Sequence, residues 1–108
     1  MLTLTAVGNL ARDPEIKTVG DNEVANFTVL CNRKNKNGDI VTQIDCSVWG
    51  KRSQVIADFL TKGSQITVTG EVYVEQYDRK DGDKGAKIVL RVNDFGLPPK
   101  ARQTETPF

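Results

Sequence analysis

Strict alternation of apolar and polar side chains marks the stretch from Gln65 to Tyr77 as a strand with one buried face. The small or apolar residues of one parity are Ile66, Val68, Gly70, Val72 and Val74. Because successive strand side chains point to opposite faces, this set is expected in the core and the alternate set in water. The water-facing set contains Tyr73 and Tyr77 among otherwise polar residues. Two aromatic rings are therefore predicted on a solvated sheet face.

The segment from Ile40 to Trp49 follows the same rule. Ile44, Cys46 and Val48 share the predicted core face, and Trp49, the only tryptophan, falls on the polar face. A third ring is thus predicted outside the core, on a neighbouring strand.

The remaining pattern predicts three further strands and one helix. The strands are expected over residues 2–9, 24–32 and 87–94, with a tight turn at Asn37-Gly38. Residues 51–62 predict the helix, with Ser53 as N-cap, an apolar stripe and a basic last turn ending at Gly63. Five strands with one short helix between strands 3 and 4 predict an all-β fold, the five-stranded Greek-key barrel called the OB-fold. Phe27 and Phe59 are expected in its core.

Two glycines and the point where the periodic pattern ends predict the corners and the boundary of the barrel. Gly50 and Gly70 are expected at barrel corners, and Phe95 at one end of the barrel. Residues 1–96 are predicted to form the barrel domain, which would bind and oligomerise. Residues 97–108 show no periodicity and are expected to form a short flexible tail.

The composition changes little in this outline of the fold, but it narrows the expected cellular location. The chain has 15 basic and 14 acidic residues, too balanced to indicate a polyanionic partner by itself. There is no apolar run near the ~20 residues of a membrane span and no signal-peptide pattern, so a cytoplasmic protein without a membrane partner is expected. Cys31 and Cys46 have core parity and are expected to be reduced thiols.

Nothing in the sequence favours catalysis. The chain has no histidine, its acidic residues are scattered, and no glycine-rich loop matches a phosphate-binding motif. We expect no enzymatic activity, no metal site and no cofactor.

The three aromatic rings that are predicted on polar strand faces suggest a function. Trp49, Tyr73 and Tyr77 could stack on unpaired bases, which all present a π-face. Each ring alone is also compatible with packing on cross-strand neighbours or with burial by another subunit. Basic residues border these strands and are candidates for phosphate contacts. They are Arg33, Lys34, Lys36, Lys51, Arg52, Arg79, Lys80, Lys84 and Lys87.

Several segments resemble a known family. VGNLARDPEIK, VANFTV and DCSVWGKRSQVIADFLTKGSQITVTGEV, together with Tyr77, resemble the bacterial-type single-stranded DNA-binding protein family. The resemblance implies an OB-fold homotetramer that binds single-stranded DNA without sequence preference in DNA replication, recombination and repair. It also implies that Trp49 and Tyr77 stack on bases. Gln43 departs from the family, which usually has another aromatic there.

The tail departs from the family as well. The resemblance implies a short form that lacks the long linker and most of the acidic tip, as would suit a phage, plasmid or accessory version. Pro107 and Phe108 could still dock into a basic pocket of replication or repair proteins. A dimer in place of a tetramer stays open. So does another function, a protein-interaction or primosome-type adaptor in which the exposed rings form a partner or subunit surface.

Overall fold

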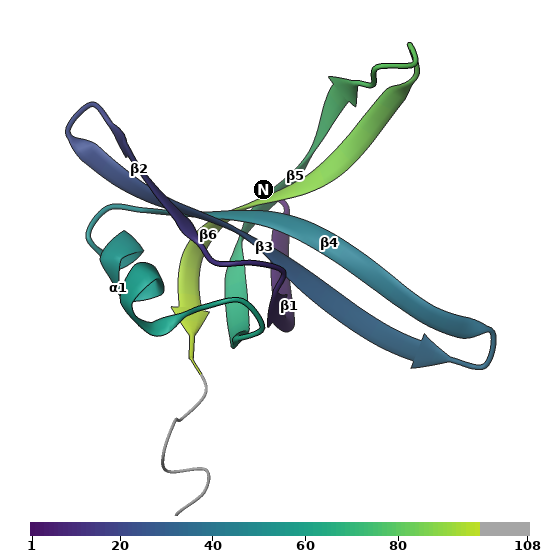
Figure 1. Cartoon of the computed structure of the whole chain (residues 1–108), viewed down its shortest axis with the longest axis horizontal. Helices are drawn as coiled ribbons and strands as arrows, with labels where there is room; N and C mark the ends of the chain where they lie inside the picture. Colours follow the sequence, from purple (N-terminus) through teal and green to yellow (C-terminus); the bar gives the residue numbers. More distant parts are fainter. Residues whose placement is uncertain (98–108) are drawn as a thin grey trace, which may run out of the picture.

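Six strands and one helix make up residues 1–97, the part of the chain that the computed structural model describes (Figure 1). In chain order they are β1 (Thr3–Leu10), β2 (Glu15–Val19), β3 (Asn22–Asn35), β4 (Gly38–Trp49), α1 (Arg52–Phe59), β5 (Gln65–Asp78) and β6 (Lys84–Gly96). The strands are ordered β1-β5-β6-β4-β3-β2, and an additional pairing of β1 with β3 closes the sheet into a barrel. The β4–β6 pair is parallel, whereas the other described pairs are antiparallel.

The predicted OB-fold is confirmed, with one correction to its numbering. The closed barrel consists of β1, β3, β4, β5 and β6. Residues Glu15–Val19 form a separate strand, β2, which pairs with β3 along its whole length. The helix therefore lies between strands 4 and 5, and not between strands 3 and 4 as predicted.

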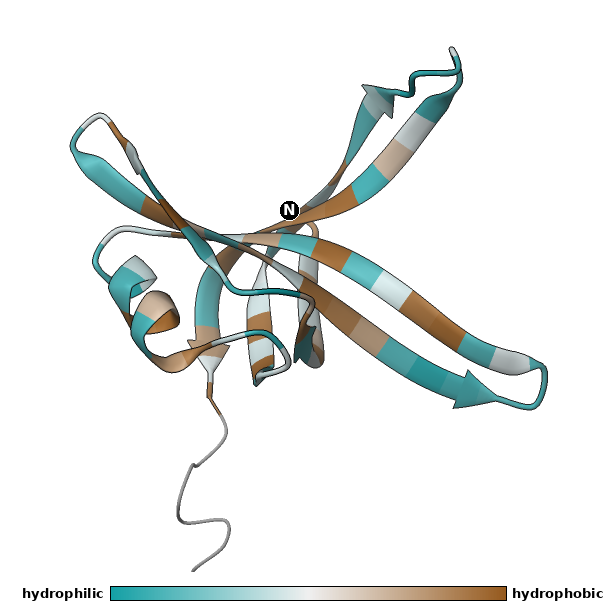
Figure 2. Cartoon of the chain, viewed as in Figure 1, coloured by the Kyte–Doolittle hydropathy of each residue, from teal (hydrophilic) through white to brown (hydrophobic). Residues whose placement is uncertain are grey.

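Two hairpins extend well beyond the barrel, so their strands are longer than the sequence indicates (Figure 1). We call them the β3–β4 arm (residues 32–41) and the β5–β6 arm (residues 74–88). Figure 2 shows that hydrophilic residues dominate their outer ends. Apolar periodicity signals strands that bury one face, and these ends lie beyond the barrel, where backbone hydrogen bonding holds the strands together.

The turn of the β3–β4 arm lies close to its predicted position. Asn35 pairs with Gly38 across the arm, and the backbone N–H of Asn37 donates to Asn35 Oδ1 at 2.8 Å. Gly38 has a φ of 123°, which a residue with a side chain rarely adopts. Positive φ is therefore confined to the glycine and does not include Asn37.

The barrel interior contains the apolar parity of each strand together with two residues from the helical segment. Phe27, Ile44, Cys46 and Val48 are buried as predicted, and Ile56 and Leu60 join them at one end of the barrel. Phe95 is half-buried against the same cluster. Two predicted core residues are instead exposed. They are Phe59 at the end of α1, 52% exposed, and Val74 at the start of the β5–β6 arm, 63% exposed.

The helix is shorter than predicted and is capped differently. Ser53 lies inside α1 with its side chain buried, and the N-cap position is Lys51, without a side-chain hydrogen bond. After Leu60 the chain hydrogen-bonds to the end of β1 and its following turn. Lys62 N–H donates to Asp13 Oδ1 at 2.8 Å, and Gly63 N–H donates to the Leu10 carbonyl at 2.8 Å. These bonds explain why the predicted last helical turn does not form.

The two glycines assigned to barrel corners differ in role. Gly50 connects β4 to α1 with a φ of 88°. Gly70 lies in β5 at a register shift against β6, where one extra β6 residue bends the sheet. The corner prediction therefore holds for Gly70, whereas Gly50 is a turn residue.

The two cysteines are free thiols, as expected, and they should differ in reactivity. Burial, with smaller contributions from Asp45 and Cys31, raises the pKa of Cys46 to about 12. Burial also raises the pKa of the half-buried Cys31. A pKa near 12 leaves the thiol protonated at pH 9, and lowers its thiolate fraction there roughly 500-fold relative to an ordinary cysteine.

We therefore expect iodoacetamide at pH 9 to label Cys31 well before Cys46 in the folded protein. Peptide mass spectrometry over a time course would measure both rates. A Cys31→Ser variant serves as control, because it should label slowly when folded and fully in urea. Equal labelling rates of the two cysteines in the folded protein would contradict the assignment.

Candidate nucleic-acid interface

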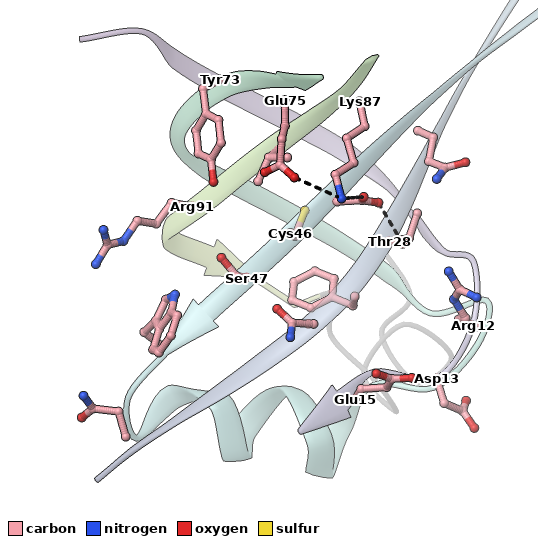
Figure 3. A pocket seen from close by; sticks show the side chains of 17 residues that line it. Arg12, Asp13, Glu15, Thr28, Cys46, Ser47, Tyr73, Glu75, Lys87 and Arg91 are labelled. Carbon is pink, nitrogen blue, oxygen red and sulfur yellow. Dashed lines mark hydrogen bonds and ion pairs between the residues drawn. The ribbon is translucent and has the colours of Figure 1, made fainter. Parts of the chain in front are cut away.

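A groove of about 820 Å³ crosses the outer face of β3, β4, β5 and β6 (Figure 3). Its lining residues on these strands are mainly the parity that points away from the barrel interior. The connection between β1 and β2 borders it through Arg12 and Asp13. The groove is thus built from the face on which the sequence predicts aromatic rings.

Two of the three predicted rings line this groove. Trp49 is 42% exposed and Tyr73 is 49% exposed, so neither is sealed in the core. Tyr77 lies on the same face of β5 but four residues farther along, on the β5–β6 arm, and is 43% exposed. Four strand residues span ~13 Å, so the two tyrosines can contact different bases of one strand.

A polar network crosses the groove floor from β3 to β5. Thr28 Oγ1 donates to Asp45 Oδ1 at 3.2 Å, and Lys87 Nζ lies 3.9 Å from Asp45 Oδ2. The same ammonium lies 3.6 Å from Glu75 Oε1 on the opposite side (Figure 3). Four strands are therefore tied together by side chains at this point, and the charge of Lys87 is shared with two carboxylates.

The groove has no excess of positive charge. Four acidic and three basic side chains line it: Asp13, Glu15, Asp45 and Glu75, with Arg12, Lys87 and Arg91. A surface of this kind suits bases and their polar edges better than a row of phosphates, because the carboxylates repel the phosphate charge.

The predicted basic residues occupy three places. Lys87 lies in the groove, as described above. The others, apart from the pair that follows Gly50, are exposed on the two arms: Arg33, Lys34 and Lys36 on the β3–β4 arm, and Arg79, Lys80 and Lys84 at the tip of the β5–β6 arm. The β3–β4 arm is therefore cationic, whereas acidic residues balance the basic residues of the β5–β6 arm.

The pair that follows Gly50 lies at the start of the helix. Lys51 is exposed at its N-cap. Arg52 turns toward the end of β6, where its guanidinium donates to the Asn93 carbonyl and lies 3.4 Å from Asp94 Oδ1. The guanidinium carbon also lies 5.3 Å from the centre of the Phe95 ring. These contacts hold Arg52 at the barrel end, which makes it the predicted cation with the most intramolecular partners among those described here.

The site prediction did not include Arg12, Arg91 and Gln43, all of which line the groove. Arg91 could have been found by extending the parity argument to the last strand, since it alternates with the buried Leu90 and Val92. Arg12 follows no strand pattern, and only the fold brings it to the groove. Within residues 1–97, no three potential metal ligands come together, and no helix is long and apolar enough to cross a membrane.

Comparison with known proteins identifies the family. A family profile described as the single-strand binding protein family matches residues 1–98. The chain belongs to the single-strand binding protein family. Members of this family that resemble it include proteins named single-stranded DNA-binding protein from Paenarthrobacter aurescens and Mycolicibacterium smegmatis, with 33% and 32% identity over 103 residues.

The alignments cover a larger share of this chain than of the two relatives. The alignments take in 87% of this chain but only 60% and 62% of the two relatives, so the chain spans about three-fifths of their length. Single-stranded DNA-binding protein 1 of Synechocystis is 35% identical over 94 residues, which cover 84% of this chain and 78% of that relative.

Proposed function

We propose that this chain binds single-stranded DNA without sequence preference, by stacking bases on aromatic side chains and by neutralising phosphates. The observation that supports this most is the groove with two half-exposed rings, Trp49 and Tyr73, and with a third ring, Tyr77, on the same sheet face. Exposed rings on a sheet face contribute ~1–3 kcal/mol per stacked base and tolerate any sequence. The family and the names of the relatives agree with this proposal.

The charge distribution suggests a path for the strand. Bases would enter the nearly neutral groove, and phosphates would follow the basic residues of the two arms together with Arg12 and Arg91. Arms of this kind can reach along the backbone on both sides of the stacked bases.

Emission of Trp49 tests the function directly, because this residue is the only tryptophan. We expect oligo-dT to quench its fluorescence, and added salt to weaken the binding. A titration with oligomers of increasing length, combined with mass measurement in solution, would give site size and subunit number together. Unchanged emission with excess oligonucleotide at low salt would overturn the stacking proposal.

We propose further properties on the family resemblance. They are assembly as a homo-oligomer, a tetramer or a dimer, a non-enzymatic role in replication, recombination and repair, and a cytoplasmic location. The division into a barrel domain, residues 1–96, and a tail from residue 97 belongs to the same proposal. Docking of partner proteins at Pro107 and Phe108 concerns residues outside the described part of the chain.

The groove carboxylates should limit affinity. Glu75→Gln removes a negative charge 3.6 Å from Lys87 Nζ, which frees the ammonium for the DNA and removes repulsion of phosphate. We expect oligo-dT to bind about 2- to 5-fold more tightly at low salt, as suits a half-exposed charge. The gain should shrink as salt rises.

Fluorescence anisotropy of a labelled oligonucleotide would measure this change. Asp58→Asn on α1 is the matched control, since it removes one negative charge from an element that lines none of the groove. Weaker binding by Glu75→Gln would show that the carboxylate helps to hold the strand.

A further inference from the structure

Gly85 is buried although it lies in the exposed β5–β6 arm. It pairs directly with Tyr77 on β5. A Cβ atom at position 85 would lie 2.5 Å from Tyr77 Cζ, 2.7 Å from Tyr77 Oη and 2.8 Å from Arg79 Nε. The phenol ring thus lies against the bare backbone of β6, and the Arg79 side chain reaches the same place.

This contact covers one part of the ring and leaves the rest exposed. Tyr77 remains 43% exposed while the outer end of its ring lies against Gly85. An aromatic ring laid across a cross-strand glycine is a recognised way to order a sheet position that has no side chain of its own. A ring held in one orientation loses less conformational entropy when a base stacks on it.

We propose that Gly85 is a positioning residue for base stacking, and that Tyr77, Gly85 and Arg79 form a stacking subsite outside the groove. The exposed surface of Tyr77 stacks on a base, and Arg79 contacts the adjoining phosphate. Gly85 has no side chain, so the Tyr77 ring can pack against its backbone and keep its orientation. This inference rests on the proposed function. The inference adds Gly85, a residue without a side chain, to the binding site. It also makes Tyr77 part of a subsite that is distinct from the groove with Trp49 and Tyr73.

Gly85→Ala tests whether the packing of Tyr77 against Gly85 contributes to binding. The added methyl group must displace the Tyr77 ring, because it would otherwise overlap with it. We expect the affinity for a labelled dT oligomer to fall about 5-fold or more, within the range for losing one stacked base. Quenching of Trp49 at saturation should be unchanged, because the groove ring is not moved.

A double-mutant cycle distinguishes positioning from a general effect on the arm. In a Tyr77→Ala background, only the flexible Arg79 side chain remains of the three nearest contacts to the added methyl group, so adding Gly85→Ala should change affinity by less than about 2-fold. The matched control is Gly96→Ala, also in β6, where a Cβ would meet no atom within 4 Å. It should bind as the unaltered protein does. Thermal unfolding of all variants would show whether the fold is retained.

The outcomes distinguish a failure of the Gly85 proposal from a failure of the proposed function. If Gly85→Ala binds normally, or loses equal affinity with and without Tyr77, Gly85 is not a positioning residue. If Tyr77→Ala binds normally while Trp49 emission is still quenched, the subsite is wrong but the proposed function stands. If the unaltered protein does not bind the oligomer at all, the proposed function itself fails.

Discussion

Trp49→Ala is expected to weaken binding of oligo-dT about 5- to 150-fold, corresponding to the loss of one stacked base. Trp49 is half-exposed at the end of β4, where it lines the groove, so its replacement by alanine removes an aromatic surface from the groove. Tyr73→Ala should have an effect of similar kind from the neighbouring side of the groove. Anisotropy of a labelled oligomer measures both, since the first variant has lost its intrinsic probe.

The combined variant is the more demanding test. If the two rings bind different bases, their losses should add on a logarithmic scale; if they contact one base, the double variant should lose less than the sum. Phe59→Ala is the matched control, because Phe59 is also half-exposed but lies on α1, away from the groove lining. A Trp49→Ala protein with normal affinity but altered mass in solution would instead favour the adaptor function.

Parity alone predicted the position of the three rings, and the reason is physical. Within the barrel, β4 and β5 bury one face and expose the other, so the period of two in the sequence predicts a single orientation for each side chain there. Trp49 and Tyr73 could be assigned to the outer face because their neighbours, Val48 and Val72, are needed inside. The same alternation predicts a buried Val74, but Val74 is exposed because it lies in the β5–β6 arm, beyond the barrel, where neither face of the strand is deeply buried.

The charge balance of the groove could not be predicted from local sequence. Asp45 meets Lys87 because β4 and β6 pair in parallel, although the two residues are 42 positions apart in the chain. Glu75 reaches the same ammonium through the antiparallel pairing of β5 with β6. The positive charge of Lys87 beside a hairpin predicts a phosphate contact, and only the register shows that two carboxylates already share its ammonium. Arg52 illustrates the same point, since its partners come from the far end of β6.

Gly70→Ala should have the largest effect on stability. Gly70 lies where β5 and β6 change register, and a Cβ there would collide with the Arg91 carbonyl oxygen. It would also lie 2.9 Å from the Arg91 carbonyl carbon and 3.0 Å from Asn93 N. These are backbone atoms of a paired strand, so no side-chain rotation can relieve the overlap.

The two strands must therefore separate or shift, and we expect the free energy of unfolding to fall by about 3 kcal/mol or more, at or above the usual cost of overpacking. For a domain of this size that lowers Tm by roughly 12–24 °C. Urea and thermal unfolding at one fixed protein concentration would measure it, because assembly would add to the apparent stability. Gly96→Ala, in the same strand pair but with open space around it, should change the free energy by less than about 0.5 kcal/mol. A Gly70→Ala protein as stable as this control would mean that the β5–β6 register is not fixed by the close approach. The bend that places Tyr73 and Arg91 in one groove would then need another cause.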